Sequence, residues 1–274
     1  MRVASICFRH ILPVFTSLFL CAAGLWAGQT VSPAIKETVT ARLCPPAPGD
    51  VRLTGYLGER IGLCIRNRVL AQEAEPLIEP FRHREETRCW QSEFWGKWFT
   101  SLALAYQYRP DESTRTLMDS AVRGLVATQT ADGYIGNYRP DSHLMQWDIW
   151  GRKYCLLGLL AHYEATGNSL ALSSARRLAG HLLTEVGPGR ADIVRTGNYR
   201  GMPSCSVLEP VVALYRFTGD RHYLDFAGWI VERIESEDGP QLIAKALAGV
   251  PVAQRFPRPE QWWTWDNGMK AYEM

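Results

Sequence analysis

The sequence of 274 residues has few cysteines and none of the spacings typical of metal fingers or redox pairs. Of its seven cysteines, Cys7 and Cys21 lie in an apolar N-terminal segment, and the other five contain no CxxC pair. This odd number indicates neither a disulfide framework nor a zinc finger. Cys64 and Cys155 lie in apolar helical runs, where we expect small buried hydrophobic side chains. The HExxH metalloprotease motif and glycine-rich phosphate loops are also absent.

An excess of charge of one sign is missing as well. The chain has 30 Lys and Arg against 28 Asp and Glu. Two of the basic residues, Arg2 and Arg9, belong to the N-terminal segment, and 30 minus 2 leaves 28 basic against 28 acidic side chains. Such a neutral chain, without a run of Lys or Arg, has no electrostatic reason to bind nucleic acid or an anionic membrane. We therefore expect neither partner, apart from a membrane at the N-terminal segment.

Only one apolar run is long enough to span a membrane, and it lies at the N-terminus. Basic residues precede it, and small residues end it at Ala27. This layout is typical of a secretory signal peptide. A retained membrane anchor is the alternative, because about 20 apolar residues can cross a bilayer. We expect residues 1–27 to direct export to the periplasm or the medium, and residues 28–52 to form an extended leader.

What the sequence has instead is a repeated helical pattern. Between about residues 90 and 236, apolar residues recur at the i, i+3, i+4, i+7 spacing of one helix face. Three turn signals separate the helices: Arg109-Pro110-Asp111, Thr166-Gly167-Asn168 and Thr218-Gly219-Asp220. Glycine can end one helix, and Asp or Asn can cap the next. A tyrosine stands five residues before each capping residue: Tyr106, Tyr163 and Tyr215.

These repeats predict an all-α fold of antiparallel helical hairpins. A two-helix unit of this size cannot bury its own apolar face and must pack on its neighbours. A curved solenoid and a closed α/α toroid both satisfy that requirement. Long segments join one hairpin to the next, at roughly 131–146, 186–203 and 237–264, and long loops on one edge of a scaffold usually carry function.

The unusual residues collect where these loops enter the first helix of a hairpin. Tryptophans gather at three such places, each with one carboxylate: Trp90, Trp95 and Trp98 with Glu93; Trp147 and Trp150 with Asp148; Trp262, Trp263 and Trp265 with Asp266. The same ends of successive antiparallel hairpins face one way, so we expect these residues on one rim. Aromatic faces beside carboxylates suit a sugar, which offers C–H faces for stacking and hydroxyls for hydrogen bonds.

We predict a carbohydrate site on this rim. The predicted catalytic carboxylates are Asp148, Glu93 and Asp266. The predicted sugar contacts are Trp147, Tyr134, Asn137, Asn198, Tyr199, Arg200 and Trp265. Each carboxylate has a structural alternative: Asp148 as a first-turn charge on a helix dipole, Glu93 as an i, i+4 ion pair with Lys97, and Asp266 as a turn residue. No metal ligands are predicted within this chain.

Several short segments match the catalytic domain of one enzyme family in order and spacing. They are Gly96-Lys97-Trp98, Asp132-Gly133-Tyr134, 161–167, 175–179 and 214–220. On these segments, residues 55–274 resemble glycoside hydrolase family 127, the β-L-arabinofuranosidase-like family. The resemblance implies an (α/α)6 toroid followed by β-sandwich domains. We therefore expect residues 53–274 to form an incomplete toroid, a fragment that lacks the C-terminal hairpins and the β-sandwich domains and is inactive alone.

The chain departs from the family pattern at two places. Trp147-Asp148-Ile149-Trp150 stands where arabinofuranosidases of the family look like His-Glu-Leu-Tyr, and Pro203-Ser204-Cys205 stands where they look like Gly-His-Gln. The resemblance also implies zinc in the full-length enzyme, holding a nucleophilic cysteine, but none of the five remaining cysteines fits that ligand set. The expected function is an exported glycoside hydrolase acting on polysaccharide or oligosaccharide side chains. A non-catalytic carbohydrate-binding toroid is the alternative.

Overall fold

The computed structural model describes residues 31–36, 38, 43 and 46–251. Within that part the chain is helical and has no strand, only two isolated β-bridges. The prediction of an all-α fold is therefore confirmed. None of the described helices is both long and apolar enough to cross a membrane. The predicted signal peptide and the predicted site residues Trp265 and Asp266 lie outside the described residues.

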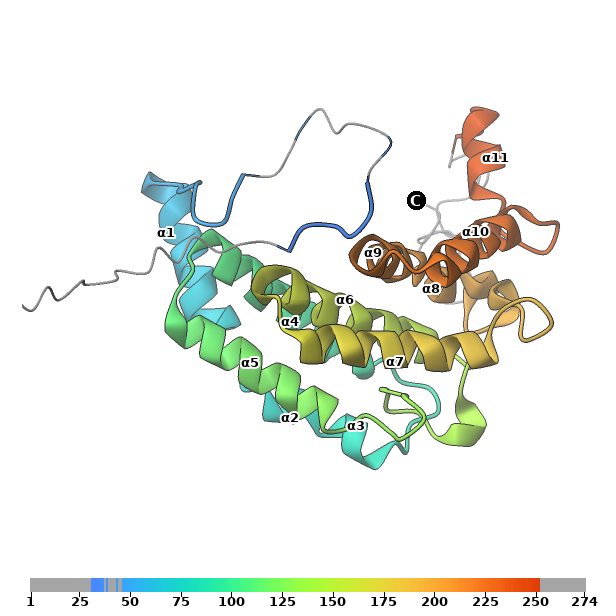
Figure 1. Ribbon diagram of the computed structural model, residues 1–274, viewed down its shortest axis with the longest axis horizontal. Coiled ribbons are helices and arrows are strands. Elements are labelled where there is room, and N and C mark those ends of the chain that lie inside the picture. The colour runs from blue at the N-terminus through green and yellow to red at the C-terminus, as the bar shows by residue number, and fades with distance from the viewer. Residues whose placement is uncertain (1–30, 37, 39–42, 44–45, 252–274) are drawn as a thin grey trace, which may run out of the picture.

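Three long helical hairpins form the body of the structure (Figure 1). They are α4 (Ser92–Tyr108) with α5 (Glu112–Val126), α6 (Asp148–Thr166) with α7 (Ser169–Glu185), and α9 (Leu208–Thr218) with α10 (Arg221–Glu235). Shorter helices precede them: α1 (Gly55–Cys64), the π-helical turn η1 (Ile65–Val69), α2 (Glu75–Ile78) and α3 (Pro80–His83). Others lie in the long loops: η2 (Pro140–Ser142), η3 (Ile193–Arg195), η4 (Tyr199–Gly201), α8 (Met202–Cys205) and α11 (Leu242–Leu247).

The hairpins pack side by side in chain order. Helix α6 contacts α4 on one side and α9 on the other, so the first helices of the three hairpins form an inner layer. Figure 1 shows α5 and α7 lying along the outside of α4 and α6. This arrangement is part of a helical toroid, as predicted. It also brings the N-terminal ends of α4 and α6 together, since both helices run in the same direction.

The turns inside the hairpins follow from local capping. Asp111, Asn168 and Asp220 each accept a hydrogen bond from a backbone N–H in the next helix, at 2.9, 2.9 and 3.1 Å. Gly167 and Gly219 adopt φ of 69°, a left-handed conformation that favours glycine. The predicted helix ends are thus confirmed at all three turns.

Residues at equivalent positions of the three repeats, counted from Tyr106, Tyr163 and Tyr215, lie in one core. The positions taken from α5 and α7 are all buried: Met118, Ala121, Val122, Leu125, Ala175, Leu178, Ala179 and Leu182. In α10 the equivalents Ala227 and Ile230 are buried, whereas Val231 and Ile234 are half-buried. The second helix of each hairpin therefore presents the same face to the first helices.

Glycine allows α4 and α6 to approach closely. A Cβ on Gly96 of α4 would lie 2.2 Å from the carbonyl oxygen of Tyr154 in α6. A Cβ on Gly158 of α6 would lie 2.5 Å from the ring of Trp95. Trp95 is fully buried and stacks on Phe99 with ring centroids 4.7 Å apart. These contacts set the spacing of the two helices whose N-terminal ends form the candidate site.

The first hairpin leaves one flank uncovered. Phe94 and Leu104 of α4 are 43% and 65% exposed beside an apolar groove of about 830 Å³ between α4 and the α1–η1 segment. Cys64, at the end of α1, is exposed, so the expectation that it is buried was wrong. The Cys64 side chain lines this groove instead of packing in the core. Cys155 in α6 is buried as expected, because α6 has helices on both sides.

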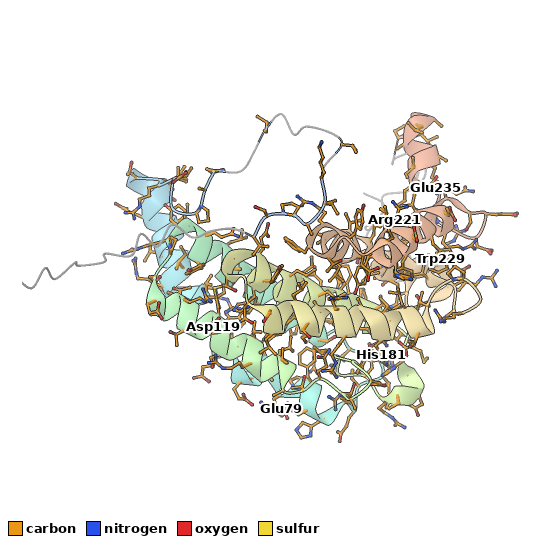
Figure 2. The ribbon with its side chains drawn as sticks, in the orientation of Figure 1. Glu79, Asp119, His181, Arg221, Trp229 and Glu235 are labelled. Carbon is orange, nitrogen blue, oxygen red and sulfur yellow. The ribbon has the colours of Figure 1, made fainter. Side chains whose placement is uncertain are left out.

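A buried histidine in α6 couples the stability of the fold to pH. His162 is fully buried, and its Nε2 lies 2.7 Å from Oδ1 of Asp119, while its Nδ1 has no hydrogen-bond partner among the described residues. Asp119 lies on α5 (Figure 2). Burial lowers the pKa of His162 from its ordinary value of 6.5, and the neighbouring Asp119 only partly opposes this effect. Protonation would place a second N–H in the core without an acceptor.

We therefore expect the free energy of unfolding to fall as the pH decreases below 6.5, because the unfolded state then binds a proton that the folded state resists. Urea denaturation between pH 7.5 and 5.5 measures this slope. His162→Gln keeps an N–H for Asp119 and should show a smaller slope. His83→Gln, at an exposed position, is the control and should keep the wild-type slope. An unchanged slope in His162→Gln would contradict this account.

Candidate functional site

Glu93 is a buried carboxylate at the N-terminal end of α4. It lies in the first turn, where the helix dipole favours negative charge. Its Oε1 accepts a hydrogen bond from Lys97 Nζ at 2.8 Å, and its Oε2 accepts one from the indole N–H of Trp150 in α6. The i, i+4 pair predicted from the sequence is present. However, Glu93 is only 7% exposed and also bonds a second hairpin, so it is more than a surface ion pair.

Aromatic rings form a continuous row beside Glu93. Ring centroids lie 6.2 Å apart for Trp90 and Trp147, 6.0 Å for Trp147 and Trp150, and 5.1 Å for Trp150 and Tyr154. Tyr199, from the loop after α7, lies 6.0 Å from Trp147. The row begins at Trp90, which is exposed, and continues to Trp147, which is buried. Such a row offers the faces and edges on which the C–H groups of a sugar can pack.

Two lysines lie over the same rings. Lys153 Nζ is 4.4 Å from the ring centroid of Trp150 and 4.3 Å from that of Tyr154, and Lys97 Nζ is 5.8 and 5.1 Å from them. Burial lowers the pKa of Lys153, as does the charge of Lys97, although the charges of Glu209 and Glu93 oppose the shift. We call this group the rim cluster; it comprises Trp90, Glu93, Lys97, Trp147, Trp150, Lys153, Tyr154 and Tyr199.

Comparison with known proteins identifies the family of the chain. A family model described as the beta-L-arabinofuranosidase, GH127 catalytic domain matches residues 61–244, which is more than half of the chain. The chain belongs to this family. The family resemblance seen in the short sequence segments is thereby confirmed.

Two relatives show how much of a GH127 protein the chain spans. It is 27% identical over 164 residues to the non-reducing end beta-L-arabinofuranosidase of Bifidobacterium longum subsp. longum, covering 55% of this chain and 24% of that protein. A solved GH127 beta-L-arabinofuranosidase from Geobacillus stearothermophilus T6 is 19% identical, with a TM-score of 0.50, covering 70% of this chain and 32% of that one. The structural likeness supports the fold. The chain spans about a quarter to a third of these relatives.

Asp148, the first residue of α6, is buried, and both oxygens of its carboxylate accept hydrogen bonds. Its Oδ1 accepts from the hydroxyl of Tyr134 at 2.8 Å. Its Oδ2 accepts from the backbone N–H of Leu144 at 2.9 Å and from Arg152 Nη2 at 2.5 Å. These contacts join the start of α6 to the preceding loop. A catalytic role for Asp148 stays a prediction, and its contacts are those of an anchor that positions neighbouring Trp147.

Arg152 extends this anchor to α7. Its guanidinium is fully buried and donates to Asp148 and to Glu185, and it lies over the ring of Tyr134, 4.6 Å from the centroid. Burial alone would lower the pKa of Arg152, but the charges of Asp148 and Glu185 raise it overall. Burial would likewise raise the pKa of Glu185. The hydrogen bonds from His143 and His181 and the charge of Arg152 outweigh this effect, and they hold the pKa of Glu185 well below its ordinary value.

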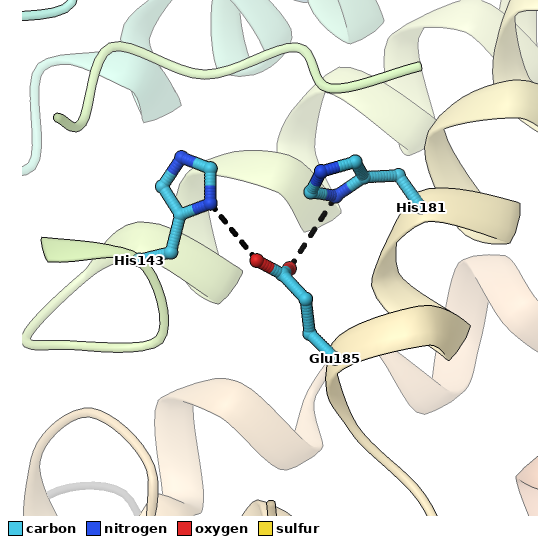
Figure 3. A group of neighbouring side chains, drawn as sticks. All are labelled: His143, His181 and Glu185. Carbon is cyan, nitrogen blue, oxygen red and sulfur yellow. Dashed lines mark hydrogen bonds and ion pairs between the residues drawn. The ribbon is translucent and has the colours of Figure 1, made fainter. Parts of the chain in front are cut away.

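His143, His181 and Glu185 are the one described group whose ligand atoms lie close enough together to hold a metal ion (Figure 3). His143 Nδ1 lies 2.9 Å from Glu185 Oε1, and His181 Nδ1 lies 3.3 Å from Glu185 Oε2. The guanidinium of Arg152 already bonds Glu185 and lies 3.3 Å from His181 Nδ1. This cation already pairs with the carboxylate that a metal ion would use, so in this structure the three residues and Arg152 form an ion-pair network.

The described residues do not supply the zinc–thiolate set that the GH127 resemblance implies. Burial raises the pKa of Cys205 to about 12 and also raises that of Cys155, so both thiols resist the deprotonation that metal binding requires. Cys64 and Cys89 are exposed and belong to no such group. Zinc therefore stays a prediction for the full-length enzyme, and these residues do not fit it.

The predicted contacts in the loop before α6 are buried. Tyr134 stacks on His143 with centroids 4.1 Å apart, and its hydroxyl bonds Asp148. Asn137 is also buried, and neither atom of its side-chain amide has a hydrogen-bond partner among the described residues. It lies in the wall of a polar crevice that also includes Glu86 and Gln91. Sugar binding by either residue stays a prediction.

The predicted contacts in the loop after α7 differ from one another. Tyr199 joins the rim cluster through Trp147. Asn198 is half-buried, next to Tyr199. Arg200 is exposed and donates to the backbone carbonyl of Asp238 at 2.7 and 3.0 Å, so its guanidinium holds the loop that follows α10. Of these three residues, the structure brings only Tyr199 into ring contact with the rim tryptophans.

Sequence reasoning missed Lys153 and Tyr154 of the rim cluster, and it missed Arg152, His143, His181 and Glu185 of the ion-pair network. Two signals were available, since Asp148 with Arg152 and His181 with Glu185 both have the i, i+4 spacing of one helix face. No spacing in the sequence identifies Lys153 as buried, because its burial depends on rings from α6 and on the neighbouring helices.

Proposed function

We propose that this chain is part of an exported glycoside hydrolase of the β-L-arabinofuranosidase type, acting on side chains of a polysaccharide or oligosaccharide. The observation that carries the proposal is the rim cluster, in which the buried carboxylate of Glu93 lies within a row of aromatic rings. Membership of the GH127 family supports the reaction class. The name of the Bifidobacterium relative supports a furanose released from a non-reducing end.

In this proposal the rim cluster binds and orients the sugar. Glu93 accepts hydrogen bonds from sugar hydroxyls, which are stronger to a charged acceptor than to a neutral one. Trp147 and Tyr199 pack against the ring, while Asp148 positions Trp147 through the start of α6. Trp265 and Asp266 stay predicted contacts of the same rim. Because the buried thiols have raised pKa values, the proposal places the nucleophile outside the described residues. Residues 28–274 alone are then expected to bind sugar without hydrolysing it.

A second candidate is a non-catalytic carbohydrate-binding toroid. Trp147 favours it, because it occupies a position where arabinofuranosidases of the family carry a histidine. A tryptophan can stack on a sugar but cannot exchange a proton with it. This candidate keeps the binding role of the rim cluster and removes the reaction.

Hydrolysis of a p-nitrophenyl glycoside panel separates the two candidates. The panel contains β-L-arabinofuranoside, α-L-arabinofuranoside and matched pyranosides, and the full-length protein is compared with residues 28–274. Release from the β-L-arabinofuranoside by the full-length protein supports the first candidate. Tryptophan quenching by sugars without release supports the second candidate. Absence of both quenching and release would contradict both candidates. The N-terminal sequence of protein recovered from the medium or periplasm tests export, and it should begin at Gly28.

Glu93→Gln should lower kcat/KM of the full-length protein by about tenfold on the best panel substrate. The carboxylate supplies charge-assisted hydrogen bonds, each of which contributes about 1.5–3 kcal/mol, and 1.36 kcal/mol corresponds to a factor of ten. Glu232→Gln, at an exposed position on α10, is the matched control and should leave kcat/KM unchanged. A Glu93→Gln variant within twofold of wild type at unchanged Tm would show that Glu93 only fastens α4 to α6.

A further inference from the structure

Lys153 is a largely buried lysine whose ammonium group has no anionic partner among the described residues, while its Nζ keeps some contact with solvent. The residue is only 7% exposed, in the second turn of α6. It forms no ion pair or hydrogen bond with any residue that the structure describes, and its near contacts are the rings of Trp150 and Tyr154. Arg152, the one other lysine or arginine buried to this degree among the described residues, pairs with the carboxylates of Asp148 and Glu185.

The nearby carboxylates do not pair with the ammonium group of Lys153. Glu93 uses one oxygen for Lys97 and the other for Trp150. Glu209, at the start of α9, is exposed and acts on Lys153 only through space. The two aromatic rings attract the ammonium through their faces, which contributes about 0.5–2 kcal/mol. They do not offer its three N–H donors the oxygen acceptors that an ammonium normally has.

The aromatic rings and the neighbouring helices displace part of the water around this cation, and no paired anion replaces that water. A site that holds an ammonium in this way favours a ligand that brings the negative charge with it, because the ion pair then forms where the screening by water is reduced. The position of Lys153 is suited to such a ligand. It stands over the inner end of the row that begins at exposed Trp90 and passes through Trp147.

We propose that Lys153 recognises a carboxylate on the sugar, so that the rim cluster takes an acidic sugar such as a uronic acid residue. The proposal rests on the proposed sugar-binding function and narrows its substrate class. The sugar ring packs along Trp147 and Trp150, its hydroxyls reach Glu93, and its carboxylate accepts hydrogen bonds from Lys153 Nζ. Lys97 adds positive charge on the same side without leaving Glu93.

Fluorescence titration of the full-length protein tests this proposal, because Trp150 lies against Lys153 and reports on its surroundings. The probes are methyl galacturonoside with methyl galactoside, and methyl glucuronoside with methyl glucoside, with sodium acetate as a simple carboxylate. At least one uronide should bind about tenfold more tightly than its neutral partner. Lys153→Met, which keeps the length of the side chain, should remove that preference, so that a uronide and its neutral partner bind within about twofold of each other. Lys153→Arg should retain it, and Lys36→Met, at an exposed position, should match wild type.

The outcomes separate this proposal from the proposed function. If neutral sugars and uronides bind equally well to the wild-type protein, the acidic-sugar proposal is overturned while sugar binding stands. Acetate binding as tightly as the uronides would overturn it as well, since the site would then recognise any small anion. Absence of binding by every sugar would overturn both. The comparison of uronides with neutral sugars in the wild-type protein tests the acidic-sugar proposal even if Lys153→Met fails to fold.

Discussion

Arg152→Met should lower the free energy of unfolding by about 3–5 kcal/mol, the usual cost of removing one partner from a buried ion pair. Arg152 is fully buried and is the cation between Asp148 and Glu185. Without it, the carboxylate of Asp148 stays buried with no opposite charge. Urea denaturation at pH 7 measures the change. Arg139→Met is the matched control, because Arg139 pairs with Asp141 at an exposed position in the neighbouring loop, where loss of the pair costs about 0–1 kcal/mol.

Restoring charge balance should recover much of this loss. The triple variant Arg152→Met, Asp148→Asn, Glu185→Gln removes the stranded charges together with the cation, and we expect it to be more stable than Arg152→Met alone. In the wild-type protein the pKa of Glu185 is below its ordinary value of 4.5. The network therefore contributes stability above pH 4.5 that is lost as the pH falls below it, and Arg152→Met should show less of this loss. A single variant within 1 kcal/mol of wild type would contradict the role given to Arg152.

Gly96→Ala should destabilise the protein by about 3 kcal/mol, at the upper end of the range for inserting one methyl group into a packed interior. The added Cβ would lie 2.2 Å from the carbonyl oxygen and 2.5 Å from the carbonyl carbon of Tyr154. These are backbone atoms of α6, which cannot rotate away as a side chain can. The two helices must separate, and Glu93 should lose its hydrogen bond from Trp150.

Gly180→Ala is the matched control for this prediction. Gly180 lies inside α7, and a Cβ built on it meets nothing within 4 Å. Alanine is favoured over glycine in a helix by about 0.5–1 kcal/mol, so this variant should gain stability. Opposite signs for the two glycine variants in urea denaturation would confirm that close approach of α4 and α6 is responsible. A Gly96→Ala variant as stable as wild type would show that the helices can adjust freely.

The helical hairpins could be predicted because their information is local. Asp111, Asn168 and Asp220 cap the next helix within three residues of themselves, and Gly167 and Gly219 end the helix they follow. Spacing within one helix also predicted the pair of Glu93 with Lys97 correctly. Contacts of this kind depend on residues a few positions apart, so the sequence displays both partners together.

The candidate site could be predicted only in part. Trp90, Trp147 and Tyr199 were placed on one rim from the order of the hairpins, and their rings do lie near one another. Asp148 was expected on the same rim, but its predicted catalytic role, like the predicted sugar contact of Tyr134, rested on residue type. A carboxylate that binds a buried arginine and one that faces a pocket look the same in a sequence, because the difference lies in what surrounds them.

The sequence by itself therefore determined the helices, their caps, their repeat and the family to which the chain belongs. Tertiary structure alone decided which polar groups are buried and with whom they pair. Glu93 meets Trp150 across 57 residues, and Arg152 meets Glu185 across 33. The burial of Lys153 likewise needs α4, α6 and α9 in their final places. The physical reason is that the energy of a charge depends on the solvent and charges around it, and only the packed hairpins exclude that solvent and bring those charges together.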